Sequence, residues 1–445
     1  MYTKSIDKCI YLNTTIMKNP FLNFPFLLLL TILIGTELNA QFKVDAQLRT
    51  RFELRDGYQK LAVAGSTPAA MVWQRTRISF SYESELLKLK IAPQDVRLWG
   101  DEQLETTTGV FGDSAAFDLF EGFAEIKIGP LGWISVGRQQ LVYDSKRLLG
   151  DRNWNNNGIS YDAALLKLGF SDWKIHAGFS WNTLKEASSD NLYPTTRIKS
   201  LNFAWVNRKF SDNLNLSLLH IASGVTETDT TNNINFRQTT GLYSDYKKGD
   251  FSAWGNAYYQ YGKNRKGTSV SALLIDADAN YKLGNFSPGL GFGYLSGNSK
   301  TGAEQTTDHL FDNLYGNRHR YFGLMDYFRT YSSHTKQGGL VDYYVYLDYK
   351  INKSFGIKNI GHYFQLAQTN PTTPSKKNLG YENDLVATYK YNDWGTLEAG
   401  YLFYLPTKTL KAIQGVADNK FSQFFYLQLT LTPTLFKQEA ESKNL

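Results

Sequence analysis

The chain has 445 residues, a formal net charge of +7 and an isoelectric point of about 9.0, with 42% hydrophobic and 20% charged residues. Aromatic residues reach 15%, so the chain is too apolar for a disordered protein, and its mean hydropathy of −0.38 excludes a bundle of membrane-spanning helices. The abundance of Tyr (29) and Phe (28) favours β-structure.

The only long apolar run lies within residues 1–40. A basic start after Met17, a short apolar core and a small residue before Gln41 are typical of a cleaved secretory signal peptide, and the run is too short to span a membrane comfortably. We therefore predict that residues 1–40 are a signal peptide with Met17 as the true initiator, and that 41–445 form a single domain. The lone Cys9 lies in the predicted signal peptide, so the mature chain would have no cysteine for a disulfide or a catalytic thiol.

After the signal peptide, the chain alternates between apolar and polar residues. In residues 42–54 the apolar series begins with Phe42 and Val44, and the polar series between them begins with Lys43 and Asp45. Because successive side chains of a strand point to opposite faces, one face of this strand is apolar and the other is charged. The pattern recurs in segments that start near residues 42, 73, 87, 117, 133, 158, 172, 198, 213, 236, 250, 270, 286, 338, 357, 381, 394 and 421.

Short alternating strands in an even number, separated by turn residues, are typical of barrels in the outer membrane of Gram-negative bacteria. We therefore expect an all-β protein, a transmembrane antiparallel β-barrel of about 18 strands with an apolar lipid face and a polar lumen. Short turns alternate with longer stretches, which we expect to be external loops: 55–72, 100–116, 143–157, 183–197, 224–235, 296–337, 368–380 and 405–420.

The sequence shows no convincing catalytic set, cofactor-binding motif or metal site, and we do not expect an enzyme. Gly289-x-Gly291-x-Gly293 resembles part of a nucleotide-binding loop, but the residues between these glycines alternate as in a strand. The six histidines lack metal-ligand spacing. The export signal and the absence of a basic helix argue against nucleic acid as a partner. An outer-membrane lipid-modifying enzyme would need a Ser/His pair on the outer wall or rim, and no such pair stands out.

A basic lumen is the clearest chemical feature of the predicted barrel. The alternation directs Arg49 and Arg51 of the first strand inward, together with Arg75 and Arg77 of the second, and Lys174 lies on the polar face of its strand. A guanidinium group is always charged and can bind a carboxylate through two parallel hydrogen bonds, so several of them would draw anions into a pore. The alternative is that neighbouring acidic residues neutralise these arginines as ordinary wall charges.

Seven short motifs lie along the mature chain: Trp73-Gln74-Arg75-Thr76-Arg77, Asp95–Gly100, Gly137-Arg138-Gln139, Arg147–Gly150 and Tyr161-Asp162-Ala163, with Asp312–Tyr315 and His319–Phe328 in a late external loop. Together these motifs resemble the alginate export family, and the resemblance covers essentially the whole mature chain. It implies an eighteen-stranded outer-membrane barrel with an electropositive, arginine-lined conduit for an acidic polysaccharide. It also implies that Arg75, Arg77, Arg97, Arg138 and Arg147 line or abut this path, with Asp162 as an acidic partner.

The alternation leaves the facing of two of these arginines open. Arg138 shares the parity of the outward Ile134, so it points inward only if a bulge at Gly137 turns it, or it lies at the mouth of the pore. Pro93 interrupts the strand that carries Arg97, and the facing of this arginine is unsettled.

The long segment 296–337 is unusual for an external loop. Loops of this length are mostly functional or disordered, and its many aromatic residues make disorder a poor fit. We expect this segment to fold into or over the pore and narrow it, with four gating candidates: Arg318, His319, Arg320 and Asp326. The alternative is a solvated external flap.

We therefore expect a monomeric, anion-selective passive channel, without cofactor, whose cargo is an acidic polysaccharide (alginate-like) or another anionic solute. The alternative is a general or oligosaccharide-uptake porin with the same wall. Outer-membrane lipid surrounds such a barrel, and a periplasmic scaffold protein is a further candidate partner. The direction of flow and the identity of the polymer are left open by the residues.

Overall fold

The structure is a computed structural model that describes residues 40–100, 116–189 and 192–438. The predicted signal peptide lies almost wholly outside these residues, as does most of the expected external loop 100–116, so the cleavage before Gln41 stays a prediction.

Eighteen long strands build the described part of the chain, and each of the eighteen predicted strands begins within four residues of an observed one. Two shorter strands and three short helices lie among them: β14 (Thr307–Asp308), β20 (Thr434–Gln438), η1 (Gly302–Glu304), α2 (Tyr331–His334) and α3 (Lys408–Gln414). The long strands are β1 (Gln41–Asp56), β2 (Ala69–Glu83), β3 (Leu87–Leu98), β4 (Ala116–Lys127), β5 (Gly132–Gln139), β6 (Tyr161–Phe170), β7 (Trp173–Trp181), β8 (Ser200–Lys209), β9 (Leu214–Thr226), β10 (Ile234–Lys248), β11 (Phe251–Lys263), β12 (Ser269–Tyr281), β13 (Phe286–Leu295), β15 (Leu340–Lys350), β16 (Phe355–Gln365), β17 (Asn378–Asn392), β18 (Gly395–Pro406) and β19 (Ser422–Leu431).

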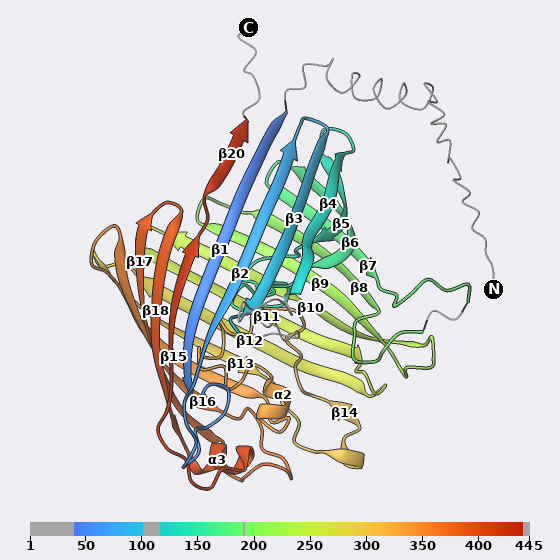
Figure 1. Ribbon diagram of the computed structural model, residues 1–445. Coiled ribbons are helices and arrows are strands. Elements are labelled where there is room, and N and C mark those ends of the chain that lie inside the picture. Colours follow the sequence, from blue (N-terminus) through green and yellow to red (C-terminus); the bar gives the residue numbers. More distant parts are fainter. Residues whose placement is uncertain (1–39, 101–115, 190–191, 439–445) are drawn as a thin grey trace, which may run out of the picture.

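These strands form a closed antiparallel barrel, as predicted (Figure 1). Each long strand pairs with its neighbours in sequence, and the barrel closes where β1 pairs with β19 from Leu48 to Asp56. Closure leaves these strands without a free edge, which satisfies the backbone hydrogen bonds inside a membrane. No helix in the described ranges is long and apolar enough to cross a membrane.

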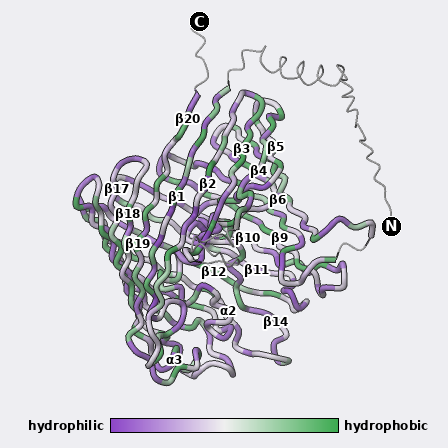
Figure 2. Tube along the Cα trace, viewed as in Figure 1, coloured by the Kyte–Doolittle hydropathy of each residue, from purple (hydrophilic) through white to green (hydrophobic). Residues whose placement is uncertain are grey.

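Hydrophobic and hydrophilic residues alternate along the strands of the wall (Figure 2), and the two-residue period of a strand places them on opposite faces. On β15, Tyr343, Val345 and Leu347 are exposed on the outside, whereas Tyr344 and Tyr346 between them are half-buried inside. An apolar outer band with a polar lumen is what a lipid environment requires of a barrel wall.

The two ends of the barrel differ in their connections. At one end, turns of at most four residues join β2 to β3, β4 to β5 and each later pair of strands up to β17 and β18. Some of these turns contain residues with a positive φ angle, such as Ser171 and Gly284. The longer loops, as far as their residues are described, lie at the opposite end. Short turns mark the periplasmic end of an outer-membrane barrel and long loops the external end.

Two of the long loops fold inside the barrel. We name residues 140–160 the first inner loop and residues 296–339 the second inner loop. Phe311, Met325 and Phe328 of the second inner loop have no exposed surface, and residues of this loop contact the inward-facing side chains of Gln260 on β11 and Glu382 on β17. The prediction that this segment folds into the pore is confirmed. Residues 143–157 join β5 to β6 at the end of the longer loops, as expected of an external loop, but they also fold back against the inner wall, which the sequence did not predict.

Candidate functional site

The inward arginines of β1 and β2 hold the first inner loop. Arg49 donates to the carbonyl oxygens of Asn153 and, at 3.2 Å, Asn155. Arg51 donates to the carbonyl oxygen of Trp154 at 2.9 Å, and Arg75 donates to Asn153 Oδ1 at 2.8 Å. Hydrogen bonds from a charged donor are about twice as strong as neutral ones. The loop is therefore fixed to the wall by its own backbone oxygens.

The oxygens of the first inner loop therefore shield the positive charge of these arginines on the wall. Arg49 and Arg75 lie directly opposite each other in the β1–β2 register, and neither forms an ion pair with a described carboxylate. Like charges in this position repel each other, and the loop oxygens offset part of that repulsion. Arg51 differs, since it also pairs with Glu53 at 2.7 Å.

Arg77 is fixed by other groups. Its Nε donates to Gln94 Oε1 at 3.1 Å, and its guanidinium carbon lies 3.4 Å from the ring centroid of Phe120. Gln94 in turn donates to the carbonyl oxygen of Asn157 at 3.1 Å. The four arginines therefore face inward as predicted, but their first contacts are with protein groups.

The first inner loop is in direct contact with the second inner loop. Arg152 donates to the carbonyl oxygens of Leu314 at 2.8 Å and Tyr315 at 3.2 Å. Nearby, the ring of Trp154 stacks on the imidazole of His319, with centroids 3.9 Å apart. Burial lowers the pKa of Arg152, and repulsion from Arg318 lowers it further.

The second inner loop also binds the wall directly. The backbone N–H groups of Leu324 and Met325 donate to carboxylates on β17, at 3.0 Å to Asp384 and 2.7 Å to Glu382. Arg147 of the first inner loop, which is buried, pairs with Asp276 of β12 at 2.5 Å. The two loops thus form one body that bridges opposite parts of the barrel wall.

Asp326 lies at the centre of this body and is buried. Its carboxylate accepts a hydrogen bond from the Tyr58 hydroxyl at 2.5 Å and lies 2.9 Å from His319 Nδ1. Burial alone would raise the pKa of Asp326, but the charge and hydrogen bond of His319 and the hydrogen bond from Tyr58 outweigh it and hold the pKa below its ordinary value. Burial, together with the charge of Asp326, raises the pKa of Tyr58 well above its ordinary value.

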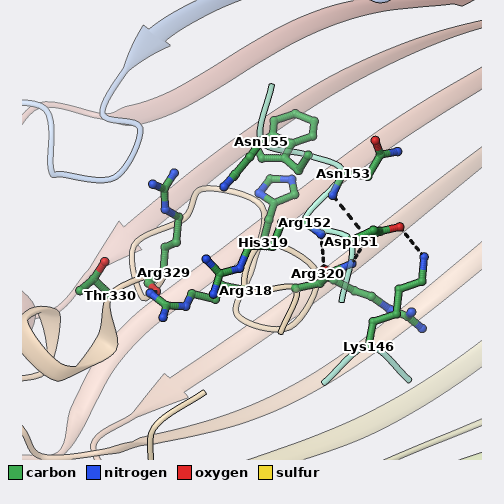
Figure 3. A pocket seen from close by; sticks show the side chains of 12 residues that line it. Lys146, Asp151, Arg152, Asn153, Asn155, Arg318, His319, Arg320, Arg329 and Thr330 are labelled. Atoms are coloured by element: carbon green, nitrogen blue, oxygen red, sulfur yellow. Dashed lines mark hydrogen bonds and ion pairs between the residues drawn. The ribbon is translucent and has the colours of Figure 1, made fainter. Parts of the chain in front are cut away.

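The two loops enclose a cavity of about 320 Å³, which we name the basic cavity (Figure 3). Five basic side chains line it against one carboxylate, that of Asp151, which is already paired with Lys146 at 2.7 Å. Arg318 and Arg320 donate only long hydrogen bonds of 3.3–3.4 Å to backbone carbonyls. The guanidinium of Arg329 has no hydrogen-bond partner among the described residues. The basic residues are Lys146, Arg152, Arg318, Arg320 and Arg329.

A second cavity of about 250 Å³ lies on the periplasmic side of the second inner loop, and we name it the periplasmic cavity. Its wall comes from β11, β12, β15, β16 and β17, and Asp278, Asn280 and Lys358 of this wall lie near the short-turn end. Arg320 lines both cavities, so this side chain lies where they meet.

The remaining predicted site residues divide into two groups. Lys174 faces the lumen: it shares the face of His176, whose Nδ1 lies 3.0 Å from the hydroxyl of Tyr143 in the first inner loop, and its side chain is exposed. Arg97, Arg138 and Asp162 lie on the opposite, outward face of the wall.

The lumen position implied for these last three residues is therefore wrong. Arg97 pairs in register with Gln74, whereas its neighbour Val96 pairs with the inward Arg75. The irregularity in this region belongs to β4, where Phe120 is the extra residue, so Pro93 does not reverse the alternation of β3. Arg97 bonds to Asp95 on the outside.

Arg138 stays outward because Gly137 adds no reversal to β5. It forms a pair of 2.9 Å hydrogen bonds with Asp162, its register partner on β6, near the external rim. Asp162 is indeed the acidic partner of Arg138, but on the outer surface of the barrel.

Sequence reasoning missed three residues of the basic cavity: Lys146, Arg152 and Arg329. A signal for the first two was present, because residues 143–157 combine several basic residues with Tyr143 and Trp154, the same mixture of charge and aromatic rings that marks the second inner loop. Across the described residues, no group of three His, Cys, Asp or Glu side chains could hold a metal ion.

Comparison with known families decides the relationship of this barrel. A model of the alginate export family matches residues 40–332, which is more than half of the chain. The chain belongs to the alginate export family. No curated protein matches it.

Solved structures of outer-membrane porins share the fold of this alginate export barrel. OpdK of Pseudomonas aeruginosa, solved with vanillate, is 12% identical, with a TM-score of 0.59, and the match covers 89% of this chain and 98% of that chain. OccAB1 of Acinetobacter baumannii is 13% identical, with a TM-score of 0.60, and the match covers 89% of this chain and 97% of that chain. OccK11 (OpdR) of Pseudomonas aeruginosa is 13% identical, with a TM-score of 0.57, and the match covers 89% of this chain and 96% of that chain. With its family and its closed barrel, the chain is an outer-membrane channel of a Gram-negative bacterium.

Proposed function

We propose that this alginate export barrel is a passive channel that favours anions, and that its selectivity is set in the basic cavity rather than on the bare wall. The observation that carries the proposal is the imbalance of charge there: five basic side chains face one paired carboxylate. A basic, narrow site raises the local concentration of anions and repels cations.

The cargo that this chemistry suits best is an acidic saccharide, alginate-like or related, whose carboxylates are spaced along a chain. The planar guanidinium groups of Arg318, Arg320 and Arg329 can each bind a carboxylate through two hydrogen bonds. Conduction requires sites that are weak enough to release the cargo, and several arginines in sequence let a polyanion pass from one to the next.

A porin for small anionic solutes is the second candidate. The basic cavity and the periplasmic cavity have volumes of about 320 and 250 Å³, and cavities of this size suit a single small solute as well as a segment of an extended chain. OpdK, which shares the fold, was solved with vanillate, a carboxylate.

Swelling of liposomes that contain the purified barrel tests the proposal. We expect glucuronate to enter faster than glucose, a neutral sugar of nearly the same size, and an oligomer of uronic acids to enter faster than a neutral oligomer of equal length. Equal rates for the charged and neutral partners would contradict anion preference. Entry of the monomer with exclusion of the oligomer would favour the small-solute porin.

A further inference from the structure

The periplasmic cavity has a chemistry that anion preference does not explain. An inorganic or small organic anion needs positive charge and hydrogen-bond donors, which Arg320 and Lys358 supply. The cavity also presents aromatic rings and acceptor groups, among them Tyr344 and Tyr346. Aromatic surfaces combined with a few placed polar groups are typical of sites for organic ligands with both apolar and hydroxylated parts.

Tyr344 and Tyr346 form a rigid pair on the inner wall. They are alternate residues of β15, and their ring planes differ by 23°, so that both rings lie in nearly the same orientation. Both hydroxyls donate to one carboxylate, that of Asp278, at 3.0 and 2.8 Å. One anchor therefore fixes the outer ends of both rings, which removes their rotational freedom before any ligand arrives.

Glycines of β13 let these two rings lie flat against the wall. Gly291 pairs in register with Tyr344, and Gly289 pairs with Tyr346. A Cβ atom at Gly291 or Gly289 would lie 2.1 or 2.2 Å from a ring carbon of its tyrosine, so no other residue leaves room for the rings. The glycine pattern noted in the sequence thus serves to flatten two aromatic side chains on the lumen surface.

The faces of the rings that point away from these glycines border the cavity. The ammonium group of Lys358 lies 4.5 Å from the ring centroid of Tyr346, which shows that this face accepts a positively polarised group. Because the side chain of Lys358 is long and flexible, a ligand can displace it from the ring of Tyr346. The C–H groups on the face of a pyranose ring carry a partial positive charge, which is weaker than the charge of this ammonium group.

Polar groups beside the rings match the hydroxyls of a sugar. The carboxylate of Asp278 accepts two hydrogen bonds from tyrosines and keeps further acceptor capacity. The side chain of Asn280 both donates and accepts, and Arg320 donates from the second inner loop. Trp254, which pairs in register with Asp278, extends the aromatic surface along the wall.

We propose that the periplasmic cavity is a binding site for the pyranose ring of a saccharide, with the ring stacked on Tyr344 and Tyr346 and its hydroxyls bonded to Asp278 and Asn280. The site recognises the sugar ring itself and therefore takes neutral as well as acidic saccharides. This inference rests on the barrel being a channel for saccharides but is independent of its preference for anions.

Single-channel recording in a planar bilayer tests the site. A neutral glucose hexamer, added on the side of the short turns, is expected to interrupt the current of the wild-type channel. Tyr344→Ala and Tyr346→Ala are each expected to shorten these interruptions by about tenfold, a change of about 1.4 kcal/mol in binding. Tyr343→Ala is the matched control, because this tyrosine belongs to the same strand but lies exposed on the outer face, and it should leave the interruptions unchanged.

A second measurement needs no variant. Titration of the detergent-solubilised wild-type barrel with the same neutral hexamer is expected to change the fluorescence of its tryptophans, because Trp254 lines the cavity. Absence of both current interruption and fluorescence change, with neutral and uronic hexamers alike, would overturn the inference and leave the anion preference standing. Equal interruption in wild type and in both tyrosine variants would overturn it as well. Interruption by the neutral hexamer in a channel without anion preference would support the inference and contradict the proposed function.

Discussion

Trp154 and His319 lie face to face, with ring centroids 3.9 Å apart and ring planes 7° from parallel. The first belongs to residues 140–160 and the second to residues 296–339, so this contact joins the two inner loops across a separation of more than one third of the chain. Arg51 of the wall lies over the same indole, with its guanidinium carbon 3.9 Å from the ring centroid. The wall, the first inner loop and the second inner loop are thus stacked in this order.

Trp154→Ala should loosen the second inner loop while leaving the barrel intact. Truncating a fully buried Trp costs about 3–5 kcal/mol, and because this ring is half-buried we expect a local loss of roughly 2 kcal/mol. Amide exchange of residues 317–322 should become faster, and the single-channel current noisier. Trp394→Ala, at the periplasmic end of the wall, is the control and should change neither. Unchanged exchange in Trp154→Ala would mean that the two loops are held independently.

Arg49→Gln should release the first inner loop. This arginine donates to three oxygens of residues 153–156, and hydrogen bonds to charged groups contribute about 1.5–3 kcal/mol each. We expect faster amide exchange in residues 153–156 and higher conductance, with only a small change in ion preference. A large loss of anion preference with unchanged exchange would show instead that Arg49 faces the permeating ions.

Deleting residues 302–330 should raise single-channel conductance several-fold. The deleted segment contains most of the buried aromatic residues of the second inner loop, which occupy the lumen. The barrel strands do not include these residues apart from the two-residue β14, so assembly should persist, as judged by heat-modifiable mobility on gels. Unchanged conductance in a folded barrel would contradict the inward position of the loop.

Acid should weaken the anchor of the second inner loop through Asp326. The pKa of this carboxyl is held below its ordinary value of 3.8, so its ionised form stabilises the folded loop. That contribution is complete above about pH 4 and is lost as the pH falls through the lowered pKa. Conductance noise should therefore rise below about pH 4 in the wild type. Asp326→Asn should be noisy already at neutral pH, and a quiet, pH-independent record from this variant would contradict the assignment.

The barrel itself could be predicted from the sequence, because the two-residue period of each strand is a local property. The alternation of apolar and polar residues is complete within a single segment, such as Phe42 to Leu54 or Tyr343 to Tyr349. The number of such segments then fixes the number of strands in the barrel. The inward direction of Arg49, Arg51, Arg75 and Arg77 follows from the same period.

What these arginines contact could not be predicted in this way. Arg49 and Arg51 donate to backbone oxygens of residues 153–155, about a hundred positions away, and a backbone carbonyl leaves no mark on side-chain periodicity. The lumen position expected for Arg97 and Arg138 failed for a different reason. It came from likeness to a family motif, whereas the uninterrupted register of β3 and of β5 decides which way these two side chains point.

The reversal potential across a KCl gradient tests the central claim most directly, namely that the basic cavity formed by the two inner loops sets ion preference. We expect the wild-type channel to favour anions, and Arg318→Gln combined with Arg329→Gln to shift the reversal potential toward cations. Arg97→Gln combined with Arg138→Gln removes the same amount of charge from the outer face and should leave it unchanged. A reversal potential that the first pair of substitutions does not move, or that both pairs move equally, would contradict the claim.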